Sequence, residues 1–334
     1  MSGRALRIVT GLTGLAGLAV VVILIAYYNI ATVAELLIGV GWGVAVVIAV
    51  HAAPMTASAL AWHAITRTLW PGGFKVILWA RLVREAAGNL LPVAQIGSDV
   101  VGARILAING ARAVDAGASV LVDLTLEFLT QIVFVIIGLL LLMAIGGGEA
   151  VRWVLIGLAM AVPAAAGFLL AQRAGLFILL ERLLERMAKQ FRLPVLGSLA
   201  GLHETTISIY RRRRVLGVAA FWHLVSWGLG AVEVWLILRF LGADVGLYDA
   251  FIIESLGQAV RSAAFLVPGA FGVQEGGFVV IGVMFGLGPE IGLSVSLVKR
   301  IRDVVLGVPA LLAWQAIEGR RLFEPTAGAE DKLP

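Results

Sequence analysis

The sequence predicts an all-α fold: a polytopic integral membrane protein with about six full spans and two broken helical hairpins. The first reason is composition, because 60% of the 334 residues are hydrophobic and only 14% are charged. The second is that apolar residues gather into long runs, and about 20 helical residues cross a bilayer. The third is that two more apolar stretches are interrupted by proline, glycine and charges. Soluble proteins carry about 25% charged residues, so soluble enzymes and disordered chains are excluded.

The full spans are predicted from continuous apolar runs. The run over 8–28 is longer than the apolar core of a signal peptide, which has about 7–15 residues, so we expect a retained first span. The next run contains Pro54, which we expect to kink its helix. In chain order, the remaining spans are predicted over 36–65, 116–145, 153–171, 215–241 and 291–316.

Two membrane halves are predicted on either side of a polar connector. In the connector, leucines recur at helical spacing with charged residues between them, which is typical of an amphipathic helix on a membrane surface. A second polar helix is expected to lead into the basic run 211–214. The predicted divisions are a first membrane half (1–172), a cytoplasmic connector (173–214), a second membrane half (215–318) and a cytoplasmic tail (319–334).

Lysine and arginine are unevenly distributed between the predicted loops. They concentrate near both termini, in 67–112 and in the connector, whereas the turns at 29–35, 146–149 and 242–246 are nearly free of them. The positive-inside rule therefore places both termini and the connector in the cytoplasm. The net charge of +5 then indicates contact with an anionic lipid surface, and no nucleic acid partner is predicted.

The two interrupted stretches resemble each other. Each contains an apolar pair, a proline and small residues, and an arginine precedes each proline. Asp99 follows Pro92 by seven residues, and Glu275 follows Pro268 by the same distance. With the termini and the connector in the cytoplasm, each interrupted stretch must enter and leave the membrane on the same side. The first stretch opens to the cytoplasm, and the second opens to the outside. The sequence therefore predicts re-entrant hairpins over 75–112 and 248–288, related as an inverted repeat.

A simpler explanation stays open, because helices interrupted by glycine and proline are frequent in membranes. If the repeat holds, the substrate is expected near the middle of the bilayer, between the broken helices. Non-helical backbone at that depth has to line protein or a water-filled cavity.

Many charged residues lie inside the apolar segments, although each costs about 2.5–3.5 kcal/mol at the bilayer centre. One explanation is structural ion pairs, such as Arg84–Asp123 or Asp99–Lys299. The other is a hydrophilic cleft that accepts a polar head group. We expect both kinds to be present.

Helical spacing places several polar residues on common faces. Asp123, Glu127 and Gln131 recur every four residues, so their face must meet protein or water rather than lipid. Arg300 and Asp303 are spaced to form an ion pair. The predicted substrate-binding and transport residues are Arg84, Asn89, Gln95, Asp99, Arg104, Asp123, Glu127, Arg261, Gln274, Glu275, Lys299, Arg300 and Asp303.

No catalytic residue, metal site or cofactor is predicted. The chain has no cysteine, and its four histidines lack the spacing of metal ligands. A phosphate-binding loop for ATP is absent, and the glycine-rich stretch 269–277 belongs to a membrane hairpin rather than to a nucleotide-binding turn. We therefore expect a protein that is not an enzyme.

The hairpin motifs carry a resemblance to a known family. The stretch Asn89-Leu-Leu-Pro92, followed by Gly97-Ser-Asp99 and by Arg104, resembles the membrane domain of the lysylphosphatidylglycerol synthases. The stretches 118–123 and 268–276 resemble it too, and 92–104 is most similar to the hopanoid-biosynthesis-associated branch. The resemblance covers residues 10–318.

In two-domain members of that family, the membrane domain is regarded as the flippase, and a separate cytosolic domain transfers the aminoacyl group. We expect no such second domain in this chain, so the resemblance implies a lipid translocase rather than a synthase. The implied substrate is a polar-headed lipid, a hopanoid or a phospholipid, in a bacterial inner membrane. We expect the cationic site residues to attract the head group, and the acids to balance their charge or relay a proton.

Two alternatives stay open. One is an intramembrane enzyme that modifies a lipid head group, for which the sequence offers no convincing nucleophile or metal site. The other is a non-transporting partner of lipid or hopanoid biosynthesis enzymes, docked through the amphipathic connector. The enzyme would release a covalently changed lipid, and the partner would not depend on the charges inside the membrane.

Overall fold

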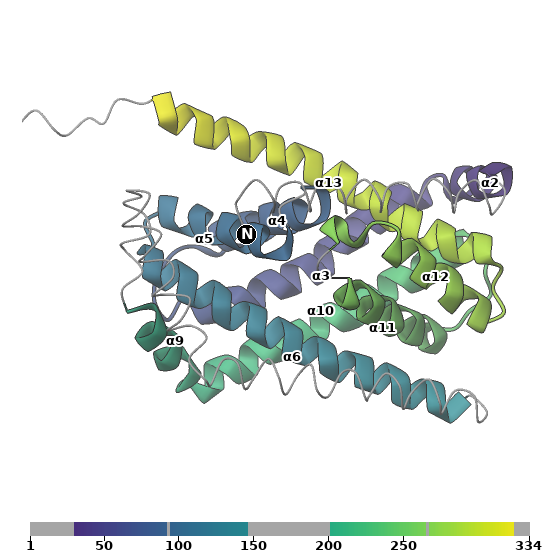
Figure 1. The fold of residues 1–334 in the computed structure, drawn as a ribbon, viewed down its shortest axis with the longest axis horizontal. Helices are drawn as coiled ribbons and strands as arrows, with labels where there is room; N and C mark the ends of the chain where they lie inside the picture. The colour runs from purple at the N-terminus through teal and green to yellow at the C-terminus, as the bar shows by residue number, and fades with distance from the viewer. Residues whose placement is uncertain (1–29, 92–93, 146–200, 265–266, 324–334) are drawn as a thin grey trace, which may run out of the picture.

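The computed structural model describes residues 30–91, 94–145, 201–264 and 267–323, and Figure 1 shows their arrangement. In these ranges the regular structure is helical and contains no strand, which confirms the all-α prediction. Among the described residues, the helices long and apolar enough to cross a membrane are α3 (Gly43–Thr66), α6 (Ala113–Ile145) and α10 (Arg213–Phe240). The spans predicted over 8–28 and 153–171, and the amphipathic helix of the connector, lie outside the described residues. The short helix α9 (Leu202–Tyr210) precedes α10 and packs against α6.

The span predicted over 36–65 is two helices, so that prediction is wrong at its start. α2 (Ile30–Val40) is separated from α3 by a turn in which Gly41 has a φ of +45°. Glycine adopts this left-handed conformation without the steric cost that other residues meet, so the first helix ends here. α2 packs against the last long helix, α13 (Pro289–Phe323).

The first broken stretch forms a helical hairpin. α4 (Phe74–Leu90) ends where the backbone of Leu91 turns extended, directly before Pro92. The ring of a proline disfavours helical backbone in the residue before it, which explains why α4 stops at this point. α5 (Ala94–Ile108) packs along α4 and leads into α6.

The second broken stretch forms a corresponding hairpin. Its elements are α11 (Leu247–Ala263), the 3₁₀ turn η2 (Pro268–Ala270) and α12 (Val273–Met284), which leads into α13. Gly269 and Gly272 have φ values of +59° and +78°, so this break depends on glycine. Glu275 caps α12 by accepting a hydrogen bond from the backbone N–H of Gly272 at 2.7 Å.

The helices of the two halves correspond in order, α3 to α6 in the first and α10 to α13 in the second. α3 packs against α10, α4 packs against α13, and α11 packs against α6, so the packing partners are exchanged between the halves. Figure 1 shows the α4–α5 hairpin toward one end of the long axis and the α11–α12 hairpin toward the other. This opposed arrangement is what an inverted repeat requires.

The breaks of the two hairpins approach each other closely. A Cβ on Gly269 would lie 2.7 Å from the backbone oxygen of Asn89, nearer than Cβ atoms are found in practice. Glycine therefore allows η2 to lie against the end of α4. An apolar cluster around Trp62 and Ile77 packs mainly the first hairpin, and another around Ile281 packs mainly the second.

Candidate functional site

Arg84 is the centre of a buried charge network between three helices. From α4, its Nε donates to Asp99 of α5 at 2.6 Å, and its Nη1 donates to Asp123 of α6 at 2.6 Å. The predicted pair Arg84–Asp123 is therefore confirmed. A guanidinium holds two carboxylates at once because its N–H groups form a rigid fork. Arg84 thus ties both arms of the first hairpin to the helix that follows it.

Two more groups extend this first network. Arg81 donates to both oxygens of Glu127, at 2.9 and 2.6 Å. His223, which comes from α10 in the other half, lies 3.1 Å from the second oxygen of Asp123. Asp123 and His223 are fully buried, so the carboxylate of Asp123 is balanced by side-chain partners rather than by water.

The second hairpin has ion pairs of its own. Lys299 of α13 donates to Glu254 of α11 at 2.6 Å, and both side chains are buried. Arg300 of α13 donates from Nε to Glu275 of α12 at 2.8 Å. The long helix after the hairpin therefore binds both of its arms, whereas in the first half Arg84 of α4 binds both α5 and α6.

Two predicted ion pairs are wrong. Lys299 does not bind Asp99, because each of these residues has its partner inside its own half. Asp303 accepts from Arg302 at 2.6 Å rather than from Arg300. Spacing along one helix shows which side chains share a face, but it does not show which neighbouring helix offers a nearer partner.

Polar contacts also join the two halves. Arg261 of α11 donates from Nη2 to the side-chain oxygen of Asn89 in α4. Both were predicted site residues, and the structure brings them together where the breaks meet. Gln131 of α6 donates to Ser262 of α11 at 2.7 Å, so the second hairpin is bound to the long helix of the first half as well.

A further buried network, which the sequence analysis missed, connects four helices. His51 of α3 contacts Glu85 of α4 at 3.0 Å and Glu233 of α10 at 2.8 Å. Arg302 of α13 donates to Glu233 and to Asp303. Glu233 interrupts the apolar run 215–241, and an ionisable residue inside a span is reason to suspect a functional site. That pattern would have pointed to this network.

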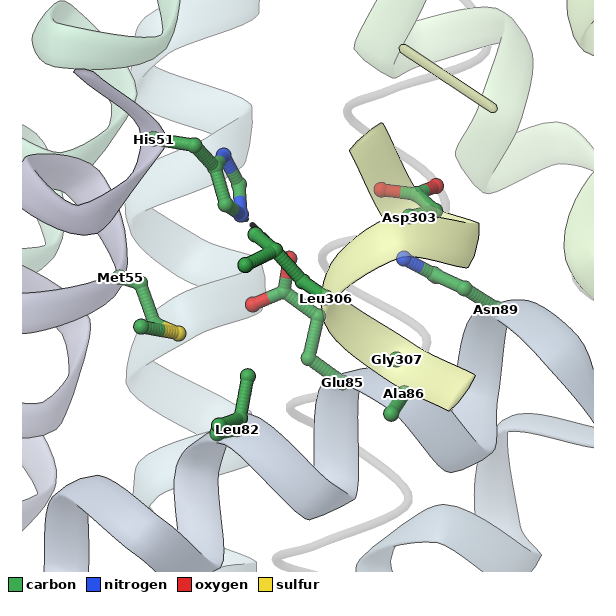
Figure 2. Close-up of a pocket in the computed structure, with 9 residues that line it drawn as sticks. All are labelled: His51, Met55, Leu82, Glu85, Ala86, Asn89, Asp303, Leu306 and Gly307. Atoms are coloured by element: carbon green, nitrogen blue, oxygen red, sulfur yellow. Dashed lines mark hydrogen bonds and ion pairs between the residues drawn. The ribbon is translucent and has the colours of Figure 1, made fainter. Parts of the chain in front are cut away.

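Figure 2 shows a small cavity beside His51, between α3, α4 and α13. Its polar lining comes from His51, Glu85, Asn89 and Asp303. Its volume is about 10 Å³, which is room for about one water molecule. A lipid head group does not fit in this space, so the site is closed here in the conformation described.

Several buried polar atoms in the second half have no hydrogen-bond partner among the described residues. Among them are Nη1 and Nη2 of Arg300, Oε1 of Gln274 and Oδ2 of Asp303. The Arg300 guanidinium lies 4.2 Å over the ring of Phe271, which offsets its charge only in part. Buried donors and acceptors are normally paired, so each of these atoms is a position where a ligand or a water would bind.

Arg104, a predicted site residue, is not part of these networks. Arg104 pairs with Glu318 at 2.8 Å, and its side chain is 45% exposed. The side chain of Gln95 lies outside the described residues. Among the residues that the structure describes, no group of three or more histidines and acids is placed to hold a metal ion.

Comparison with known families decides the relationship. The family described as "Lysylphosphatidylglycerol synthase TM region" matches residues 14–310, which include both hairpins and all the buried charge networks. The chain belongs to this family. No curated protein and no solved structure matches it. Family membership and the three long apolar helices make the chain a membrane protein of lipid metabolism or transport.

Proposed function

We propose that this family member is a translocase for a polar-headed lipid, a phospholipid or a hopanoid, in a bacterial inner membrane. In this proposal both termini and the connector lie in the cytoplasm, and the connector contacts anionic lipid. The head group passes between the two hairpins while the acyl or hopane part stays in the bilayer. The family and the two opposed, broken hairpins support this proposal.

The observation that carries the proposal is the state of Arg300 beside the second break. Its Nε binds Glu275, but its Nη1 and Nη2 are buried without an acceptor in the part of the chain that the structure describes. A buried donor without a partner costs about 1–3 kcal/mol, and a charged donor costs more. Phosphate or hydroxyl oxygens of a head group would supply the missing acceptors, and a guanidinium binds phosphate in bidentate geometry.

The contact between Arg261 and Asn89 indicates where the closed site would open. It joins the hairpins at their breaks, and Gly269 lies against the same end of α4. Separation of the hairpins at this contact would uncover the charges of both halves at one level of the membrane. A head group could then exchange partners with Arg261 and Arg300 instead of leaving water for an apolar environment.

Proteoliposomes with purified protein and a panel of labelled lipids test the proposal. Arg300→Gln should slow movement of the transported lipid by about tenfold or more, which corresponds to about 1.4 kcal/mol. Arg239→Gln is the matched control, because Arg239 pairs with exposed Asp244 outside the networks. The control should move lipid at the wild-type rate. Equal rates for wild type and Arg300→Gln would overturn the role of Arg300.

The same assay decides between translocation and the two alternatives. If the folded wild-type protein moves no lipid of the panel, with or without an ion gradient, translocation is overturned. A covalently changed lipid in that experiment would favour an intramembrane enzyme. An unchanged lipid, together with capture of lipid-biosynthesis enzymes, would favour a non-transporting partner.

A further inference from the structure

His51 lies between two carboxylates that belong to different helices. Its Nδ1 is 2.8 Å from Oε2 of Glu233, and its Nε2 is 3.0 Å from Oε1 of Glu85. Figure 2 shows the ring directed toward Glu85 at the edge of the small cavity. His51 and Glu233 are buried, and the side chain of Glu85 is 24% exposed. We call these three residues the histidine triad.

This geometry determines how many protons the triad holds. A neutral imidazole has one N–H and one bare nitrogen, whereas an imidazolium has two N–H groups, and an ionised carboxylate can only accept. With a neutral ring and two ionised carboxylates, one nitrogen lone pair of His51 would face a carboxylate oxygen with no proton between them. The observed contacts therefore require one additional proton. An imidazole binds a proton more tightly than a carboxylate does, so the proton belongs on His51.

The charges around the histidine triad come from every helix packed on it. Arg302 opposes a positive charge on His51, but the two carboxylates that contact the ring directly favour it. Arg302 is itself bound by Glu233 and Asp303, which leaves three carboxylates for one arginine in this bonded network. A protonated His51 reduces that imbalance. The remaining charged side chains that act on the network are Arg81, Arg261 and Lys299.

The small cavity gives the bound proton a place to go. It touches His51 and Glu85, and Asp303 lines it as well. The Oδ2 of Asp303 is buried without a hydrogen-bond partner in the described ranges, so it is available to a water molecule. The volume of about 10 Å³ is room for about one water, which would accept or return the proton.

We propose that Glu85, His51 and Glu233 form a proton-binding site that couples lipid movement to a proton gradient. With the proton bound, His51 donates one N–H to each carboxylate and holds α3, α4 and α10 together. When the proton leaves to water in the cavity, a single N–H remains, and the contact with one carboxylate is lost. Loss of the Glu85 contact would remove the ion pair that joins α4 of the first hairpin to α3. The coupling rests on the proposed translocase function, but proton binding does not.

Nitrogen NMR on the full chain in lipid, with its histidine rings labelled, tests proton binding directly. At neutral pH we expect the His51 ring to give a signal with both nitrogens protonated. This signal should be absent in His51→Gln and present in His63→Gln. His63 is a matched control, because it lies on the same helix and its Nδ1 has no hydrogen-bond partner among the described residues. Signals of a neutral His51 in the wild-type protein at neutral pH would overturn the site.

Glu85→Gln keeps the test valid if His51→Gln does not fold. The amide of glutamine can donate to a bare Nε2 while Nδ1–H still donates to Glu233, so the contacts persist without the additional proton. We therefore expect a neutral His51 in Glu85→Gln. A doubly protonated His51 in this variant would contradict the proton count.

Lipid movement with and without a proton gradient tests the coupling. The gradient should accelerate the wild-type protein, and Glu85→Gln and His51→Gln should move lipid at the same rate with and without it. If wild-type movement ignores the gradient, coupling is overturned and translocation stands. If no lipid moves at all, the proposed function fails, and the NMR experiment still decides whether the triad binds a proton.

Discussion

Arg261 of α11 donates a hydrogen bond to the side-chain oxygen of Asn89 at the end of α4, across 172 residues of sequence. Each residue lies beside the break of its own hairpin, and Gly269 packs against the backbone oxygen of Asn89. The contact therefore joins the two helical hairpins at their breaks, where the helix of each hairpin is interrupted. This hydrogen bond joins predicted site residues of the two halves directly.

Removal of this link should destabilise the folded protein. Asn89→Leu leaves Arg261 without its acceptor, and we expect a loss of about 1–3 kcal/mol, measured by thermal unfolding in detergent. Asn89→Asp restores an acceptor and should recover the stability. An Asn89→Leu protein as stable as the wild type would show that the contact does not hold the hairpins.

The close approach of the breaks depends on the absence of a side chain at Gly269. Gly269→Ala would place a Cβ 2.7 Å from the Asn89 oxygen, on backbone with a φ of +59°. We expect a loss of about 1–2 kcal/mol from the left-handed backbone, with further loss from the clash. Gly276→Ala is the control, because it lies in α12 and a Cβ there meets no atom within 4 Å. That control should be neutral or more stable in the same unfolding measurement, and equal losses in both variants would contradict the prediction.

Removal of one partner of the pair Glu254–Lys299 should lower the free energy of unfolding strongly, whereas removal of both charges should lower it little. Both side chains are buried, so Lys299→Met leaves Glu254 without its charge partner, at about 3–5 kcal/mol. The double variant Glu254→Gln with Lys299→Met removes both charges and should recover most of the stability. Thermal unfolding of the two single variants and the double variant measures this coupling. Additive losses would mean that the two charges do not depend on each other.

Asp99 should be needed for transport but not for folding. In Asp99→Asn, Arg84 keeps its contact with Asp123 at 2.6 Å, so the bundle should remain assembled. We expect lipid movement in proteoliposomes to fall to the protein-free rate. Asp244→Asn removes an acid whose side chain is fully exposed, and it should transport at the wild-type rate. Full transport by Asp99→Asn would exclude Asp99 from the site.

Part of the site could be predicted because it depends on local chemistry. Proline disfavours helix in the residue before it, so the break at Pro92 is visible in the sequence, and Arg84 with Asp123 follows from the cost of unpaired charges in a membrane. The error at 36–65 has a local origin as well. Gly41 ends a helix through its left-handed backbone conformation, which a hydropathy profile does not indicate.

The sequence by itself determined a helical membrane protein with two broken stretches and charges of both signs inside the membrane. The spacing of apolar residues, the hydropathy and the positions of proline indicate the local structure of each segment. Only the tertiary structure decided which charges meet: Lys299 binds Glu254 and not Asp99, and His51 meets Glu233 across 182 residues. The packing of the helices decides the ion-pair partners, because the cost of removing a charge from water is offset only by a partner within hydrogen-bonding distance.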